Sequence, residues 1–181
     1  MKISENFNSQ VNGTISAITK YGSAYEQLEQ LQKDYDFLQK GDQKTGVIGE
    51  FFSYLYLKDK FPNGKITIPN ASNKGVDLIV NSNKEEYNYQ VKTVSAFSET
   101  KRLSPLKDGW THLILIVLDK SFMPELFFII EKNNFKPETK TISLVDSFLA
   151  DYKDYDKTKE LKKILKKYEQ NKNNSAKKSK L

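Results

Sequence analysis

The sequence predicts an α/β (α+β) fold in which helices flank a central mixed β-sheet of about five strands. Residues 45–61 carry apolar side chains at helical spacing. Residues 75–81 and 87–94 are rich in strand-forming side chains and are separated by a short polar turn. Residues 111–119 and 126–130 are almost continuously apolar, which is typical of strands covered on both faces. The 181 residues suffice for one domain with appendages.

Composition excludes several function classes. The chain has no cysteine, so it has no disulfide, thiolate zinc site or cysteine nucleophile. Arg102 and His112 are its one arginine and one histidine, which leaves chemistry to lysines, carboxylates and amides. The first ten residues lack the apolar core of a signal peptide, and the longest apolar run, 113–118, is too short to span a bilayer. We therefore expect a cytoplasmic protein without a membrane partner.

The positive charge of the chain is concentrated at its end. The net charge is +6, and residues 157–181 hold ten lysines and two glutamates, a net of +8. The other 156 residues hold 19 basic and 21 acidic side chains, a net of −2. We expect a basic helix over 157–170 and disorder from Asn171 to Leu181. Such a tail suits phosphate backbones, and it equally suits a solubilising end.

The chain begins with a helical segment over residues 1–44. An apolar stripe at spacings of three and four runs from Val11 to Leu38, and Gly41-Asp42 ends it. Gly13 and Gly22 interrupt the stripe, which favours two helices. This segment either packs on the core or forms a dimer arm.

Residues 45–61 form the best predicted helix, at the start of a core domain that covers 45–156. Thr45 is a plausible N-cap, and Pro62-Asn63-Gly64 ends the helix. Glu50 falls in the second turn among residues that should be buried. A carboxylate there costs free energy unless a positive or hydrogen-bonding group meets it, or unless it lies on the rim and points to water.

Three strands follow, over 65–69, 75–81 and 87–94, with a polar turn at 70–74. The second and third should form an antiparallel hairpin. If their loop has an even number of residues, such as Asn83-Lys84, Asp77 falls opposite Gln90, and Lys92 shares their face. An odd loop without a bulge would separate them.

The rest of the core is predicted more coarsely. Residues 95–109 are polar and could hold a short helix. Strands over 111–119 and 126–130 are joined by a turn at 121–124, and a closing helix covers 141–155.

The polar side chains of this core suit hydrolysis of a phosphodiester with a bound divalent cation. Mg²⁺, or Mn²⁺ in its place, prefers oxygen ligands. Asp77 can be a direct ligand, with the backbone carbonyl of Val91 and the amide oxygen of Gln90 as others. Glu50 can bind the metal or hold a water on it. Lys92 can orient the attacking water and meet charge on the phosphate.

The helix with Glu50, the strand with Asp77 and the triplet Gln90-Val91-Lys92 resemble the PD-(D/E)xK nuclease superfamily over roughly residues 45–130. The chain departs from that pattern twice: Gly75-Val76 precede Asp77 where a proline is usual, and Gln90 replaces the acid of the triplet. Similar QxK variants within the superfamily can be active, although one lost negative charge should weaken metal binding. The resemblance implies a restriction-endonuclease-like core and an Mg²⁺-dependent endodeoxyribonuclease.

Within that superfamily, the chain is most similar to a compact type II-like restriction endonuclease. This implies double-stranded DNA as substrate, a homodimer and a cognate methyltransferase. Candidate DNA contacts are the lysine-rich tail and four residues after the third strand: Ser95, Lys101, Arg102 and Lys107. A structure-selective resolvase or repair nuclease on the same fold is an alternative. Another is a catalytically inert nucleic-acid-binding module, in which Gln90 marks a decayed site.

Overall fold

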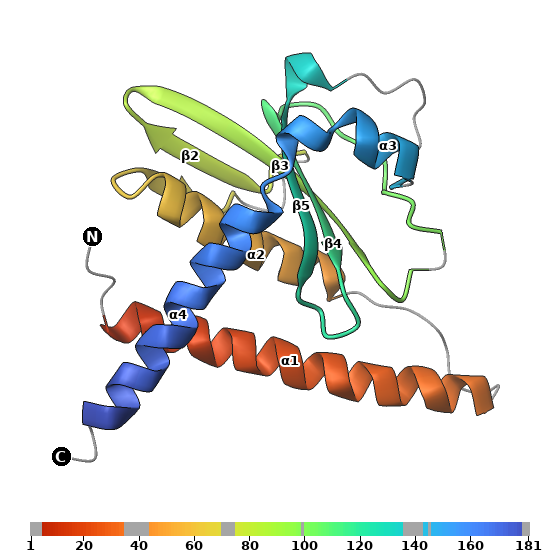
Figure 1. Ribbon diagram of the computed structural model, residues 1–181. Helices are drawn as coiled ribbons and strands as arrows, with labels where there is room; N and C mark the ends of the chain where they lie inside the picture. Colours follow the sequence, from red (N-terminus) through yellow and green to blue (C-terminus); the bar gives the residue numbers. More distant parts are fainter. Residues whose placement is uncertain are drawn as a thin grey trace.

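The computed structural model describes residues 5–34, 44–69, 75–98, 100–135, 143–144 and 146–178. Its regular elements follow in chain order (Figure 1): α1 (Glu5–Asp34), α2 (Thr45–Lys60), β1 (Lys65–Thr67), β2 (Leu78–Ser82), β3 (Glu85–Ser95), β4 (His112–Leu118), β5 (Pro124–Glu131), η1 (Lys132–Asn134), α3 (Asp146–Asp151), η2 (Lys153–Tyr155) and α4 (Thr158–Lys178). Among these elements, no helix is long and apolar enough to cross a membrane.

The five strands form one mixed sheet in the order β1-β2-β3-β4-β5. Neighbouring strands run antiparallel except β3 and β4, which are parallel. The sheet and its flanking helices confirm the predicted α+β class. The parallel pair needs a crossover between β3 and β4, and residues 96–111 supply it.

The hairpin between β2 and β3 has the two-residue loop on which the sequence argument depends. Asn83 and Lys84 both have positive φ, 53° and 67°, as a tight turn of type I′ requires. The register pairs Leu78 with Tyr89, so that Asp77, one residue earlier, lies beside Gln90.

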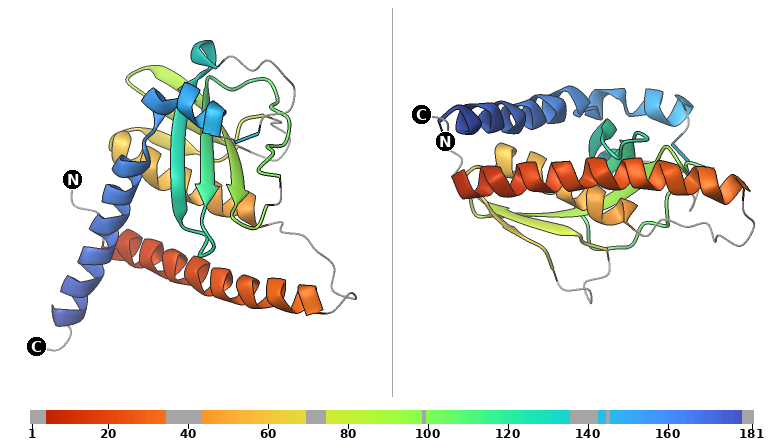
Figure 2. Two further views of the ribbon diagram at one scale, coloured as in Figure 1. Left: turned by 45° about the vertical axis from the view of Figure 1, so that its right-hand side comes forward. Right: turned by 90° about the horizontal axis from the view of Figure 1, so that it is seen from below.

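Both faces of the sheet are covered, which explains the continuous apolar run in β4. Ile114 and Ile116 join a core cluster with Phe52 of α2 and Leu161 of α4. The alternate residues of β4 join a second cluster on the other face, with Trp110, Phe128, Leu144 and Tyr152. The views in Figure 2 show α4 crossing α1, where Asn12 Nδ2 donates a hydrogen bond to the carbonyl of Tyr168 at 3.2 Å.

Over its described residues, 5–34, the N-terminal segment is a single helix, α1, that runs unbroken through Gly13 and Gly22, so the prediction that these glycines separate two helices was wrong. Gly13 lies in open space, because a Cβ at this residue would meet nothing within 4 Å. At Gly22, a Cβ would lie 2.9 Å from the carbonyl carbon of Ser121, so this glycine allows α1 to touch the β4–β5 turn. Burial of apolar side chains along α1 offsets the low helix propensity of both glycines, and α1 packs on the core through Val11, Ile18 and Tyr25.

Several other boundaries differ from the sequence predictions. The N-cap of α2 is Lys44 without a side-chain cap, so Thr45 is already helical. In the described part of 95–109 there is no helix, and Arg102 instead forms an isolated bridge with Ser143. The closing helix is reduced to α3 and η2. The disorder predicted from Asn171 was wrong as far as Lys178, because α4 continues to that residue.

Some predictions lie outside the described residues. They concern the end of the N-terminal stripe and its stop at 35–43, the polar turn at 70–74, the first residues of the closing helix at 141–142, and the last three residues, 179–181.

Candidate active site

Two half-buried carboxylates approach each other where α2 meets the sheet. Glu50 lies in the second turn of α2, and Asp77 directly precedes β2. Burial raises the pKa of Glu50 above its ordinary value, and the negative charge of Asp77 raises it further. The charge of one carboxylate therefore acts on the other, although the sequence analysis expected a positive or hydrogen-bonding group, or water, at Glu50.

Gly49 explains how α2 comes so close to β3. A Cβ on Gly49 would lie 1.9 Å from Oγ1 of Thr93, so only a glycine permits this contact. Thr93 is the residue after Lys92 on β3. The close contact therefore sets the first half of α2, including Glu50, beside the strand that carries the lysine. Sequence reasoning missed this role, although a glycine within a predicted helix is a signal for close packing.

Asp77 is attached to β3 by two hydrogen bonds. Its backbone N–H donates to the carbonyl of Tyr89 at 2.8 Å, and its Oδ2 accepts from the backbone N–H of Val91 at 2.7 Å. In an extended strand the N–H and C=O of one residue point to the same side, so the Val91 carbonyl also points toward the start of β2. The carboxylate and that carbonyl thus lie on the same side of β3.

Lys92 is held by a serine that the sequence analysis did not identify. Its Nζ donates to Oγ of Ser104 at 2.8 Å. Burial lowers the pKa of Lys92; the negative charge of Asp77 opposes that effect, and the positive charge of Lys107 adds to it. Lys92 therefore lies within the electrostatic reach of both Asp77 and Lys107. No local pattern around Ser104 signals this contact, because it joins residues twelve positions apart.

Gln90 anchors the connection between β3 and β4. It is 2% exposed, and its Oε1 accepts from the backbone N–H of Lys107 at 3.2 Å. The connection is packed closely there: a Cβ on Gly75, which has φ +119°, would lie 2.2 Å from the carbonyl oxygen of Asp108. The segment from Ser104 to Asp108 is therefore fixed beside Asp77, Gln90 and Lys92.

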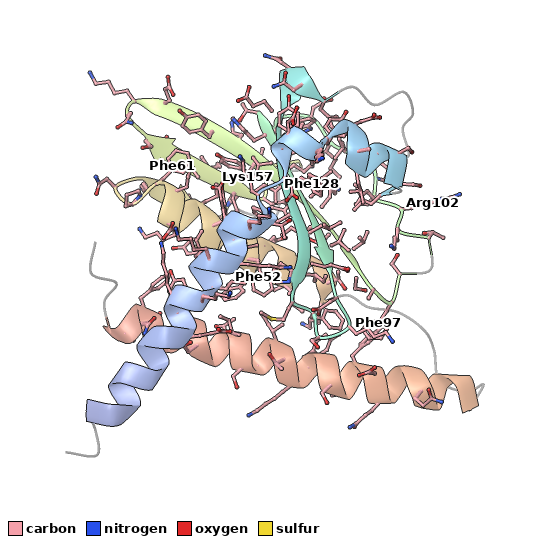
Figure 3. The ribbon with its side chains drawn as sticks, viewed as in Figure 1. Phe52, Phe61, Phe97, Arg102, Phe128 and Lys157 are labelled. Atoms are coloured by element: carbon pink, nitrogen blue, oxygen red, sulfur yellow. The ribbon has the colours of Figure 1, made fainter. Side chains whose placement is uncertain are left out.

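The predicted DNA contacts differ in accessibility. Lys101, Arg102 and Lys107 are exposed on the β3–β4 connection. Figure 3 shows Arg102 projecting at the edge of the molecule. Ser95 is 5% exposed at the end of β3, so DNA could reach its side chain only if the surroundings moved.

The oxygen donors named in the sequence analysis are of the chemical kind that a hard divalent cation takes. Within the described residues, no three or more His, Cys, Asp or Glu side chains come together as a metal-binding group. The predicted donor set consists instead of the carboxylates of Glu50 and Asp77, the amide oxygen of Gln90 and the carbonyl of Val91. Mg²⁺ is commonly held by one or two carboxylates, with water and substrate oxygens completing its shell, so this set suffices in kind and number.

Comparison with known proteins finds little similarity. No protein-family model matches the chain, and no curated protein sequence matches it. Among solved structures, a bacterial homing endonuclease (I-Ssp6803I) is similar over 75% of this chain and 99% of its own length, with 19% identity and a TM-score of 0.46. A likeness at this level says nothing about activity, so the geometry of the site has to support the function.

Proposed function

We propose that this protein is a metal-dependent endonuclease that hydrolyses phosphodiester bonds of DNA. The observation that supports the proposal most is the convergence of Glu50, Asp77 and Lys92 from three separate elements. Two of these groups have pKa values moved by burial and by Asp77, and ionisable groups whose pKa values are perturbed by burial and by a charged neighbour are typical of catalytic sites.

Each group has a role in that reaction. Asp77 and Glu50 would hold a Mg²⁺ ion, with the oxygens of Gln90 and Val91 beside them. When bound, such an ion supplies charge stabilisation at the phosphate and acidifies water. Lys92 orients the attacking water and places positive charge near the phosphate oxygens. The contact with Ser104 restricts the position of its Nζ, and a lowered pKa makes the neutral amine more accessible as a proton acceptor.

The substrate within this proposal is double-stranded DNA, cut in the manner of a type II-like restriction endonuclease. A homodimer would bring one site to each strand, and a cognate methyltransferase would protect host DNA. Exposed Lys107, whose charge acts on Lys92, supports a polyanionic substrate, as do exposed Lys101 and Arg102 on the same connection.

One observation favours a second candidate, the inert nucleic-acid-binding module. Gln90 carries no charge, and its amide oxygen is already engaged by the Lys107 N–H. If Gln90 serves only to anchor the connection, two carboxylates remain for the metal.

Digestion of supercoiled plasmid and phage DNA with Mg²⁺ or Mn²⁺ tests these candidates. EDTA, Asp77→Ala and Lys92→Ala should each abolish discrete cleavage bands, whereas Lys120→Ala, at an exposed lysine of the β4–β5 turn, should preserve them. Linear product without accumulated nicked circles would support a dimer. Cleavage that survives Lys92→Ala would refute the site. Absence of cleavage on plasmid, phage DNA and branched junctions would favour the inert module.

A further inference from the structure

Helix α4 presents a buried apolar face and an exposed lysine face on opposite sides. Its apolar face, Leu161, Ile164, Leu165 and Tyr168, is at most 6% exposed and packs in the main core cluster. The exposed side chains of the opposite face follow the helical spacing of three and four: Lys159, Lys162, Lys163, Lys166 and Lys167. The acidic Glu160 and Glu169 fall at the two edges of this face.

Four of these lysines have no acidic partner in the described part of the chain. Lys167 forms an ion pair with Asp59 of α2 at 2.8 Å. Glu160 forms ion pairs with Lys157 at 3.4 Å and with Lys60 at 3.6 Å. The remaining four, which we call the α4 lysine face, are Lys159, Lys162, Lys163 and Lys166. Their charges are not neutralised within the described residues, so they attract anions from solution.

The support under the α4 lysine face is rigid. Oη of Tyr56 donates to Glu160 at 2.9 Å, and the backbone N–H of Phe127 donates to Oγ1 of Thr158 at 2.8 Å. The rings of Phe7 and Tyr168 meet edge-on at 6.2 Å. Because the helix axis is held by α1, α2 and β5, the spacing of the lysine stems is largely set before any ligand binds.

This surface is separate from the catalytic groups. α4 contacts Tyr56, Asp59 and Lys60, in the last part of α2. Glu50 precedes Tyr56 by six residues, which corresponds to about 9 Å along the helix and to a different side of it. Figure 1 shows α4 crossing α2 and α1 rather than lying along the β2–β3 hairpin.

We propose that the α4 lysine face binds the phosphate backbone of double-stranded DNA outside the active site and without reading its sequence. Lys159 and Lys166 are about 10 Å apart along the helix axis, a length over which duplex DNA carries roughly six negative charges. Charge complementarity favours this occupant, since the chain outside residues 157–181 has a net charge of −2. The inference deepens the proposed function, on which the choice of DNA as polyanion rests.

The inference is tested by measuring the binding of a 30-base-pair duplex by fluorescence anisotropy across a series of salt concentrations. EDTA is present throughout so that the duplex is not cleaved. The variant is Lys159→Gln/Lys163→Gln/Lys166→Gln. The matched control, Lys65→Gln/Lys84→Gln/Lys120→Gln, removes the same charge from exposed lysines elsewhere. We expect the negative slope of log K against log salt to become shallower by about 2.7 in the α4 variant, or 0.9 for each lost phosphate contact. Binding at 0.1 M salt should weaken by a factor on the order of 10². The control should stay within a few-fold of the wild type.

Three results would overturn the inference: no duplex binding by the wild type, an unchanged slope in the α4 variant, or an equal loss in the control. Binding of the α4 face to phosphatidylserine vesicles with unchanged DNA affinity would also overturn it and would identify an anionic lipid surface as the partner. The digest separates this inference from the proposed function. If the wild type binds but never cleaves DNA and the α4 variant loses this binding, the result supports the inference but not the nuclease. If the wild type cleaves DNA and the α4 variant keeps the salt slope of the wild type, the result supports the nuclease but not the inference.

Discussion

Glu50 and Asp77 place two negative charges near each other where water is partly excluded. This arrangement lowers the free energy of unfolding. The pKa of Glu50 is raised in the folded protein, so the fold favours the protonated acid. Between the ordinary pKa of 4.5 and the raised value, the folded chain binds more protons than the unfolded chain, and the free energy of unfolding falls as pH rises. Groups that perform chemistry in an active site commonly lower the stability of a protein in this way.

Replacing Glu50 by Gln should therefore stabilise the protein at pH 7. The gain should shrink toward zero near pH 4, where Glu50 is largely protonated in both states. Thermal unfolding of the wild type and of Glu50→Gln at pH 7 and pH 4 measures this difference in stability. The exposed Glu125→Gln controls for loss of a surface carboxylate. A stability gain that is equal at both pH values would contradict the electrostatic origin.

Ser104 would be a positioning residue for Lys92 in the proposed reaction, since its Oγ accepts the hydrogen bond from Nζ. Ser104→Ala should reduce kcat by roughly 10- to 100-fold with little change in KM, because a hydrogen bond to a charged group contributes about 1.5–3 kcal/mol. Ser104→Thr should restore most of the rate.

The same substitution should lower the pKa of Lys92 further, because the hydroxyl stabilises the charged amine. NMR titration of labelled lysine Nζ would show this without any substrate. A kcat loss with an unmoved Lys92 titration would mean that Ser104 acts on the substrate instead.

Contacts between elements, rather than single side chains, bring the site together. α2 reaches β3 only because Gly49 has no side chain, and the β3–β4 connection is held by Gln90 and by the packing of Gly75 on Asp108. A change at any of these contacts should move a whole element and the side chains of the candidate site that it carries.

Gly49→Ala is the direct test at this scale. Its Cβ would overlap Thr93, so we expect a loss of about 1–3 kcal/mol in the free energy of unfolding, although alanine favours the helix. Gly46→Ala in the same helix meets nothing within 4 Å and should stabilise by up to about 1 kcal/mol. Urea unfolding of both variants measures the difference. Equal effects would show that α2 does not press on β3.

At the scale of the whole molecule, an aromatic cluster joins α1 to the β4–β5 turn and to the residues that follow β3, beside the contacts of Val11 and Ile18 with the core. Tyr21 and Tyr25 of α1 meet the ring of Phe122 in the β4–β5 turn at 5.1 and 5.4 Å. Phe97, two residues after β3, has its ring centroid 4.7 Å from that of Tyr25, and it lies close to α1 in Figure 3. α1 thus contacts both the turn and the start of the β3–β4 connection.

Gly22→Ala should weaken this attachment, because the added methyl would lie 2.9 Å from the backbone of Ser121, which cannot move aside as a flexible side chain could. We expect faster hydrogen exchange in α1 and at Phe97, and a loss of about 1–3 kcal/mol in stability. Gly13→Ala, in open space on the same helix, should stabilise or leave stability unchanged. Unaltered exchange in Gly22→Ala would mean that α1 docks by other contacts.

The sequence by itself determined the features that depend on local pattern. Apolar spacing predicted α2 and the apolar face of α4, and continuous apolar runs predicted β4 and β5. Side-chain alternation predicted that Asp77 would fall opposite Gln90 if the loop held an even number of residues, and the structure has a two-residue loop. Side-chain alternation and helical periodicity act over a few residues, so they can be read along the chain. Only the tertiary structure decided that α1 is unbroken at Gly22, that Gly49 touches Thr93, and that Ser104 holds Lys92. Those contacts join residues far apart in sequence, and packing of whole elements selects them, which no local pattern records.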